Sequence, residues 1–233
     1  MTDFKTFISE AFQLTLKYHN KLNPKLWKNS QLDPNISAEL CQLGWEFATF
    51  AQIPKSAVMD MVLTGGNANY NYTRFSDIDV HLICLPTGRD AEELYQSKVD
   101  WSAQHTDTRI AGAEVEFFAQ PIEEGFKEGQ GAWSLLQSKW IAVPKHLDDV
   151  AILRDNSVKA KVRHQIIVIR DLIKNGTASD IREYRDRMWR QRGAGLEKGG
   201  EFSIENIMYK DLRNRGQLQR LKSRLAELEQ SES

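Results

Sequence analysis

The sequence predicts an α+β protein in which a short mixed β-sheet is packed by helices and followed by a C-terminal helical bundle. Strand-like apolar runs are confined to residues 57–144, and the segments before and after them have helical spacing. Strands do not alternate regularly with helices, as they would in a doubly wound fold. The chain has 233 residues, of which 41% are hydrophobic, so it is large enough to bury a core.

Two helices are expected before the sheet. The first follows from apolar residues at helical spacing near the N-terminus, namely Phe4, Phe7, Ile8, Ala11 and Phe12. The second begins at Asp33 and Pro34, because an acidic cap followed by a first-turn proline is typical of a helix start. Its apolar side chains keep helical spacing up to Phe50, and Pro54 closes it.

Three strands and one connecting helix are expected next. The segments "AVMDMVLT" (57–64), "DIDVHLICL" (77–85) and "RIAGAEVEFFAQP" (109–121) have the apolar and β-branched content of strands. The polar segment 89–104 between the second and third strands predicts a helix. The segment 132–144 fits either a strand or a short helix.

Helices are expected again in the last third of the chain. An apolar stripe from Val158 to Ile173 predicts a helix that ends at Asn175-Gly176, and residues 179–192 predict a strongly basic one.

A glycine-rich stretch follows the basic helix. We interpret "GAGLEKGGEF" (193–202) as a loop, after which Ser203 caps a helix that breaks near Gly216. Leucines between residues 218 and 228 predict a last helix.

These elements divide the chain into three expected regions, which differ in charge. They are N-terminal helices packing on the core (1–56), a core that carries the sheet (57–146) and a basic helical subdomain (147–233). Up to residue 150 the chain has a net charge of −7, and from residue 151 onward it has +6. An acidic half can collect metal ions and a basic half can face phosphates, although solvated helix faces explain most of these charges.

Cysteine usage and the N-terminus point to a reducing cytoplasm. Cys41 and Cys84 each stand alone in an apolar pattern, as buried free thiols do. No apolar run approaches the ~20 residues of a membrane span, and the N-terminus lacks the features of a signal peptide.

Two aspartates interrupt the second predicted strand. Alternation along a strand places Asp77, Asp79 and His81 on one face. Two carboxylates on one strand edge repel each other, and a bound divalent cation resolves that conflict. Mg²⁺ prefers such oxygen ligands. A third acid on a neighbouring strand would complete a site for two ions, and Glu114 and Glu116 on the third strand are the candidates.

The glycine pair before these aspartates fits the same chemistry. Gly65 and Gly66 follow a strand, and backbone without side chains lets a phosphate approach closely. Asn67 and Arg74 lie in the same loop, where either side chain could reach a phosphate, although a surface arginine is about as common. Phosphate oxygens, metal ions and carboxylates together indicate phosphoryl transfer from a triphosphate.

The segment from Gly65 to Asp79 resembles the signature of the polymerase-β-type nucleotidyltransferase superfamily, which has Gly-Ser, a fixed stretch and then Asp-x-Asp. Ten residues separate Gly66 from Asp77, which matches that spacing, and Ser76 also falls where the family usually has it. Two positions depart from the pattern, since Gly66 stands in place of the usual serine and Asn69 in place of a frequent arginine.

The resemblance implies roles for these residues and a sheet of the nucleotidyltransferase type. Asp77, Asp79 and Glu116 would be the catalytic and metal-binding acids, since "VEF" around Glu116 looks like the family's third-acid strand. The triphosphate would lie at Gly65 and Gly66. Further blocks of the chain resemble a group of small stand-alone predicted nucleotidyltransferases associated with phages.

The expected activity is transfer of a nucleoside monophosphate from an NTP to an acceptor hydroxyl by two Mg²⁺ or Mn²⁺ ions. The acceptor (RNA, a protein or a small molecule) stays open, although the basic C-terminal part makes RNA plausible. Two other classes also stay open. One is a non-catalytic, antitoxin-like or nucleotide-binding protein on the same fold, and the other is a glycosyltransferase that uses Asp-x-Asp with a metal.

Overall fold

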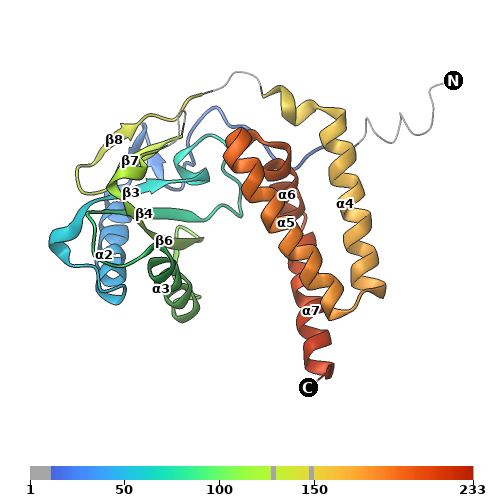
Figure 1. The fold of residues 1–233 in the computed structure, drawn as a ribbon. Coiled ribbons are helices and arrows are strands. Elements are labelled where there is room, and N and C mark those ends of the chain that lie inside the picture. Colours follow the sequence, from blue (N-terminus) through green and yellow to red (C-terminus); the bar gives the residue numbers. More distant parts are fainter. Residues whose placement is uncertain (1–11, 127–129, 147–149, 233) are drawn as a thin grey trace. The chain divides into compact units, whose positions relative to one another are not determined.

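The computed structural model describes residues 12–126, 130–146 and 150–232. They form two compact units (Figure 1). Residues 18–147 make up the first, which we call the sheet unit, and the described residues before Tyr18 join those after 148 in the second, the helical unit. By their contacts, residues 18–56 therefore group with the sheet.

The sheet unit contains a six-stranded mixed sheet in the order β5-β6-β4-β3-β7-β8. Strand β4 is parallel to β6, and the other neighbouring pairs are antiparallel. The strands are β3 (Val58–Thr64), β4 (Ile78–Cys84), β5 (Arg109–Ile110), β6 (Ala113–Pro121), β7 (Ala132–Ser134) and β8 (Lys139–Ala142). A separate two-stranded sheet joins β1 (Trp27–Lys28) to β2 (Gln31–Leu32). The predicted α+β class with a mixed sheet is confirmed.

Two predicted segments differ from the structure, and each difference is a hairpin. Residues 109–121 form β5 and β6 instead of one strand, because Ala111 and Gly112 both take left-handed φ values (51° and 84°). A two-residue turn with both φ values positive reverses the chain with the twist that antiparallel strands need. The ambiguous segment 132–144 forms β7 and β8. These hairpins extend the sheet beyond the three or four strands expected.

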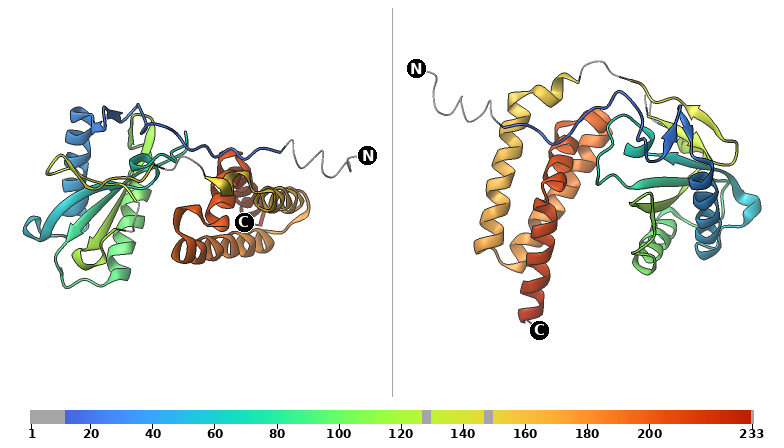
Figure 2. Two further views of the ribbon diagram at one scale, coloured as in Figure 1. Left: turned by 90° about the horizontal axis from the view of Figure 1, so that it is seen from above. Right: turned by 180° about the vertical axis from the view of Figure 1, so that it is seen from behind.

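Helices α2 (Pro34–Phe50) and α3 (Ala91–Gln104) contribute to the core on one face of the sheet (Figures 1 and 2). Helix α2 starts as the sequence predicts, with the Asp33 carboxylate accepting a hydrogen bond from the Asn35 N–H, and α3 starts with a capping box at Asp90. Phe47 of α2 stacks on Phe117 of β6, with 5.5 Å between ring centroids. The same core holds alternate residues of β4, namely Ile78, Val80 and Leu82, all of them fully buried.

Strand alternation sends the remaining side chains of β4 and β6 to the opposite face. This face carries Asp79, His81, Glu116 and Phe118, all of them partly exposed, and we call it the carboxylate face. Its deeper part is apolar, because Val62, Ile83 and Ala132 form a small buried cluster there. The fold therefore places polar groups and one aromatic ring side by side on a partly solvated surface.

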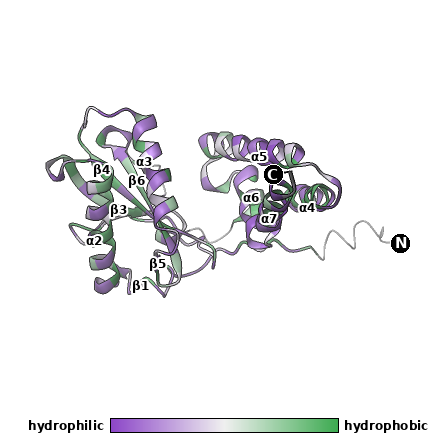
Figure 3. Ribbon diagram, turned by 90° about the horizontal axis from the view of Figure 1, so that it is seen from below, coloured by the Kyte–Doolittle hydropathy of each residue, from purple (hydrophilic) through white to green (hydrophobic). Residues whose placement is uncertain are grey.

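The helical unit has its own core. Its helices are α4 (Asn156–Asn175), α5 (Ala178–Gly199), α6 (Ile204–Asn214) and α7 (Gln217–Glu232), and α6 and α7 both pack against α4 and α5 (Figure 2). The apolar stripe predicted for α4 is confirmed, since Val162, Ile166 and Ile169 are buried in this core. In Figure 3 the strands β3 and β4 are largely hydrophobic, whereas α5 is mostly hydrophilic in colour.

The glycine-rich stretch is not the loop that we predicted. Helix α5 continues to Gly199, and Gly200 ends it with a left-handed φ of 63°. Glycines inside a helix cost about 1 kcal/mol each relative to alanine, so packing must offset them. Gly195 is buried against α6, and a Cβ there would lie 2.9 Å from Cβ of Glu205. The close approach of two helices therefore requires this glycine.

The helix predicted at residues 4–12 lies almost wholly outside the described residues. Cys41 and Cys84 are free thiols, but only Cys84 is buried as predicted, and Cys41 is partly exposed. Burial raises the pKa of Cys84 to about 11. None of the helices in the described part of the chain combines the length and the apolar composition needed to cross a membrane.

Candidate active site

The candidate site begins where β3 turns back into β4. After Thr64, Gly65 takes a left-handed φ of 70°, and a short 3₁₀ helix, η2 (Gly66–Ala68), follows. A Cβ at Gly65 would lie only 1.8 Å from Oδ2 of Asp79. Glycine is therefore required at this position both for its backbone conformation and because the Asp79 carboxylate lies directly against it.

Asn67 holds the loop between the two strands in place. Its side-chain Nδ2 donates to the backbone carbonyls of Ser76 and Asp77 at 3.0 and 2.9 Å. Its Oδ1 accepts from Asn23 at 2.8 Å, and its backbone carbonyl accepts from the Trp27 indole at 2.7 Å. The residue is 1% exposed. Its side chain therefore positions the peptide that leads into Asp77, instead of facing solvent where a phosphate would lie.

Strand register makes two of the carboxylates neighbours. Asp79 pairs with Thr64 of β3 on one side and with Glu116 of β6 on the other. Asp77 precedes Asp79 by two residues, immediately before β4, so alternation puts it toward the same face. Of the two candidates for the third acid, Glu116 is the neighbour of Asp79. Glu114 pairs with Arg109 across the β5–β6 hairpin and forms an ion pair with it.

A lysine occupies the space beside Glu116. The Lys98 ammonium of α3 lies 2.9 Å from Oε2 of Glu116 and 4.1 Å from the centroid of the Phe118 ring. The Lys98 side chain is only 19% exposed, whereas that of Glu116 is 36% exposed. Partial burial strengthens this ion pair relative to a surface pair. Glu116 therefore has a cationic partner in this structure.

The donor chemistry fits a divalent ion, but the side chains do not enclose one. Within the described residues, no group of three or more His, Cys, Asp or Glu side chains is arranged to hold a metal ion. Carboxylate oxygens on two neighbouring strands are nevertheless the ligands that Mg²⁺ prefers. Asp77, Asp79 and Glu116 therefore suit Mg²⁺ in ligand type only, and the cation that Glu116 contacts in this structure is the Lys98 ammonium.

His81 continues the carboxylate face without joining the chemistry. Its Nδ1 is hydrogen-bonded to Oε1 of Gln120 at 2.5 Å, as expected for a satisfied histidine, and its ring lies 4.9 Å from that of Phe118. Burial holds the pKa of His81 below its ordinary value, and the Lys98 ammonium adds to this effect. The ring is therefore a neutral, fixed neighbour of the acids.

The other loop residues predicted for nucleotide binding differ in exposure. Arg74 is exposed, and its guanidinium lies 4.5 Å from the centroid of the Phe75 ring. Ser76 Oγ accepts from the Thr73 N–H at 2.9 Å and would lie 3.1 Å from a Cβ at Gly66. The Ser76 hydroxyl therefore lies beside the position where a side chain at residue 66 would start.

Two sets of contacts that shape the site were not predicted from the sequence. Lys98 lies in the polar helix α3, and its spacing alone gives no signal that it reaches Glu116. Asn69 donates to the Gly65 carbonyl at 2.6 Å and accepts from the Gly131 N–H at 2.9 Å, which ties the glycine turn to the segment before β7. Such contacts depend on the tertiary fold and cannot be read from local spacing.

Comparisons with known protein families, sequences and structures do not identify a family for this chain. No protein-family model matches the chain, and no curated protein sequence matches it significantly. Among solved structures, it is similar to the STING-associated CdnE c-di-GMP synthase from Capnocytophaga granulosa. The two are 13% identical, the match covers 84% of this chain and 68% of that one, and the TM-score is 0.22. Because this TM-score is too low to relate the two folds, the functional argument rests on the chain's own residues.

Proposed function

We propose that this protein is a metal-dependent nucleotidyltransferase that moves a nucleoside monophosphate from an NTP to an acceptor hydroxyl. The observation that carries the proposal is the register of the sheet. Asp79 and Glu116 are neighbours on parallel strands, and Asp79 lies directly against the left-handed Gly65 turn. Acids beside a partly exposed glycine turn are the arrangement that a metal–triphosphate complex needs.

The chain's residues have distinct tasks in this reaction. Asp77, Asp79 and Glu116 would hold the ions, and the backbone at Gly65 and Gly66 would approach the triphosphate. Bound Mg²⁺ would lower the pKa of the acceptor hydroxyl and would neutralise negative charge on the triphosphate. Asn67 contributes by fixing the peptide before Asp77.

The bonds that change define the reaction. The acceptor oxygen forms a bond to the α-phosphorus, the bond from that phosphorus to the bridging oxygen of the β-phosphate breaks, and pyrophosphate leaves with that oxygen. The acceptor proton passes to a site carboxylate, for which Glu116 is the candidate. Positioning and charge stabilisation would supply most of the rate enhancement.

A labelling screen tests this function. Purified protein is incubated with Mg²⁺ or Mn²⁺ and each α-³²P-labelled NTP, alone, with total RNA, and with protein extract. We expect label transfer in one of these arms and its loss in the Asp77→Ala/Asp79→Ala double variant. An active wild type whose double variant keeps full activity would overturn the site assignment.

A second double variant tests whether activity is lost because these particular acids are removed or because the protein loses two negative charges. Asp100 and Asp107 are exposed acids elsewhere in the sheet unit. The Asp100→Ala/Asp107→Ala variant removes the same charge, and we expect it to transfer label at the wild-type rate.

A second candidate is a non-catalytic nucleotide-binding protein on the same fold. The Lys98–Glu116 ion pair favours it, because an ammonium group already neutralises the third acid. Binding of an NTP by equilibrium dialysis, together with no label transfer in any arm, would support this candidate over the enzyme.

A further inference from the structure

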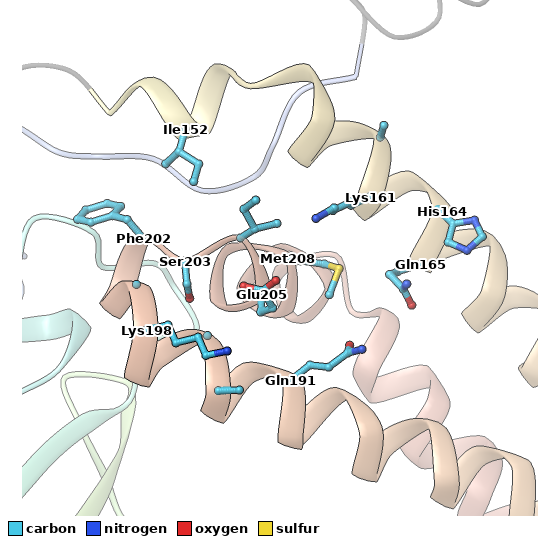
Figure 4. Close-up of a pocket in the computed structure, with 15 residues that line it drawn as sticks. Ile152, Lys161, His164, Gln165, Gln191, Lys198, Phe202, Ser203, Glu205 and Met208 are labelled. Carbon is cyan, nitrogen blue, oxygen red and sulfur yellow. The ribbon is translucent and has the colours of Figure 1, made fainter.

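A cavity of about 850 Å³ lies within the helical unit (Figure 4). Its walls come from α4, α5, the short helix η5 (Gly200–Phe202) and the first residues of α6, with Ile152 from η4 (Ala151–Arg154). A volume of this size falls within the range of pockets for small organic molecules. The glycine-rich end of α5, which the proposed function does not use, forms part of the wall.

Small residues keep this space from being filled. Ala160 of α4 and Ala194, Gly195 and Gly199 of α5 lie at wall positions. Gly195 faces α6 and not the open space, because a Cβ there would lie 2.9 Å from Cβ of Glu205 and from Oγ of Ser203. Ala160 and Ala194 are exposed wall residues whose methyl groups leave the space open.

The cavity lining combines apolar side chains with two lysines. Ile152, Phe202 and Met208 supply apolar surface. Lys161 from α4 and Lys198 from α5 extend into the cavity from different walls (Figure 4).

Neither lysine has a partner within the part of the chain that the structure describes. The same holds for His164 on the wall, whereas Lys210, a neighbour outside the lining, is paired with Glu201.

The charge balance of the lining favours an anion. Glu205, in the first turn of α6, is the one acid among the described lining residues and opposes two lysines. Both lysines are exposed, and one positive charge of the lining has no acid to balance it. The amides of Gln165 and Gln191 add hydrogen-bonding groups at the wall.

We propose that this cavity binds a small organic anion with an apolar or aromatic body. The anionic group (carboxylate, sulfonate or phosphate ester) lies between Lys161 and Lys198, and the body lies against Ile152, Phe202 and Met208. An inorganic anion would leave the apolar surface uncovered, and a neutral apolar molecule would leave both ammonium groups without a partner. This proposal does not depend on the proposed nucleotidyl transfer.

Two fluorescent probes of nearly equal shape test the charge requirement. Anilinonaphthalene sulfonate is an organic anion, and N-phenyl-naphthylamine is its uncharged parent. We expect the full chain to bind the sulfonate at one site and at least about tenfold more tightly than the parent, because the two ammonium groups attract only the charged probe. Equal affinity for the two probes would overturn the proposal.

Matched variants locate the site. In Lys161→Gln/Lys198→Gln we expect the sulfonate affinity to fall to that of the neutral probe. The control Lys174→Gln/Lys222→Gln removes two exposed lysines from the same unit, away from the cavity lining, and should bind as the wild type does. Equal losses in both double variants would indicate nonspecific charge attraction and overturn the assignment.

A filling variant tests the volume without changing the charge. Ala194→Phe places a ring at an exposed wall position, so we expect it to block the sulfonate while circular dichroism stays unchanged. Undiminished binding in this variant would count against the cavity. Competition by decanoate and by AMP then separates a carboxylate ligand from a phosphate ester, and displacement by either supports the proposal.

Discussion

The sheet unit and the helical unit hold their polar groups in different ways. In the sheet unit, the loop before Asp77 depends on hydrogen bonds that Asn67 makes with Asn23 and Trp27, from a distant part of the chain. In the helical unit, several helix starts are capped within one turn, as Thr177 and Asp180 do for α5. The candidate active site therefore depends on contacts between residues that are distant in the sequence. The helices of the helical unit depend more on residues near their own ends.

The first prediction concerns the separate cores and has the largest expected effect. Phe117 is fully buried in the sheet unit and Ile169 in the helical unit. Truncation to alanine removes buried surface and leaves a cavity, so we expect losses of about 3–5 kcal/mol for Phe117→Ala and about 2–5 kcal/mol for Ile169→Ala.

Two spectroscopic signals assign each loss to a unit. Of the six tryptophans, only Trp189 lies in the helical unit, so urea unfolding followed by tryptophan fluorescence reports mainly on the sheet unit. Far-ultraviolet circular dichroism reports mainly on the helices. We expect Phe117→Ala to shift the fluorescence transition and Ile169→Ala to shift the dichroism transition. Identical shifts of both signals in both variants would show that the two cores unfold as one.

The second prediction compares the same substitution in the two units. Asn67→Ala leaves several buried groups of the sheet unit without partners, and we expect a loss of about 1–3 kcal/mol in the free energy of unfolding. Asn175→Ala removes an exposed contact with Asp171 and should change it by less than about 0.5 kcal/mol. Denaturant titration measures both, and similar losses would contradict the contrast between the units.

The third prediction concerns Lys98 and rests on the proposed function. Removing its ammonium group takes away a cation that competes for Glu116, so Lys98→Met should bind Mn²⁺ about fivefold more tightly, on the order of 1 kcal/mol. Calorimetric titration with Mn²⁺ measures this, and Lys139→Met on β8 is the control. Unchanged affinity would refute competition by Lys98, whereas wild-type affinity in Glu116→Gln would refute the metal site itself.

The fourth prediction has the smallest effect and concerns the local capping of α5. Hydrogen bonds from Thr177 hold the pKa of Asp180 below its usual 3.8. As the pH falls, the Asp180 carboxylate is therefore protonated in the unfolded chain before it is protonated in the folded chain. The stabilisation by this carboxylate is present above pH 3.8 and is lost below it. We expect Asp180→Ala to lower the Tm slightly at pH 7, with the difference shrinking below about pH 3.8. Thermal melts across this range test it, with Ser179→Ala as control.

Much of the fold could be predicted because strands and helices leave periodic patterns. The buried stripe of α4 and the run "DIDVHLI" specify their elements by spacing alone, and Asp33 specifies the start of α2 by its cap. The glycine-rich end of α5 could not be predicted, because it is helical only through packing of Gly195 on α6. The turn at Ala111 and Gly112 was missed because an alanine with positive φ carries no turn signal.

For the candidate site, the sequence predicted which face of the strand each acid lies on, but not the contacts that each acid makes. Alternation correctly puts Asp79 on the face opposite the core, and the structure makes Glu116 its neighbour. Spacing alone did not separate Glu114 from Glu116, because they share a face. The family resemblance favoured Glu116, and the parallel register makes Glu116 the neighbour of Asp79. It also did not predict the burial of Asn67, whose partners come from a segment some forty residues away.

The contact between Gly65 and Asp79 also limits how this chain can change over time. Any side chain at position 65 would collide with the carboxylate at position 79, and the backbone there disfavours residues other than glycine. A descendant could lose this glycine only after shortening the aspartate, and that step would remove the acid next to the turn. In related chains the two positions should therefore persist together or disappear together, so covariation at this pair would trace which lineages keep the carboxylate.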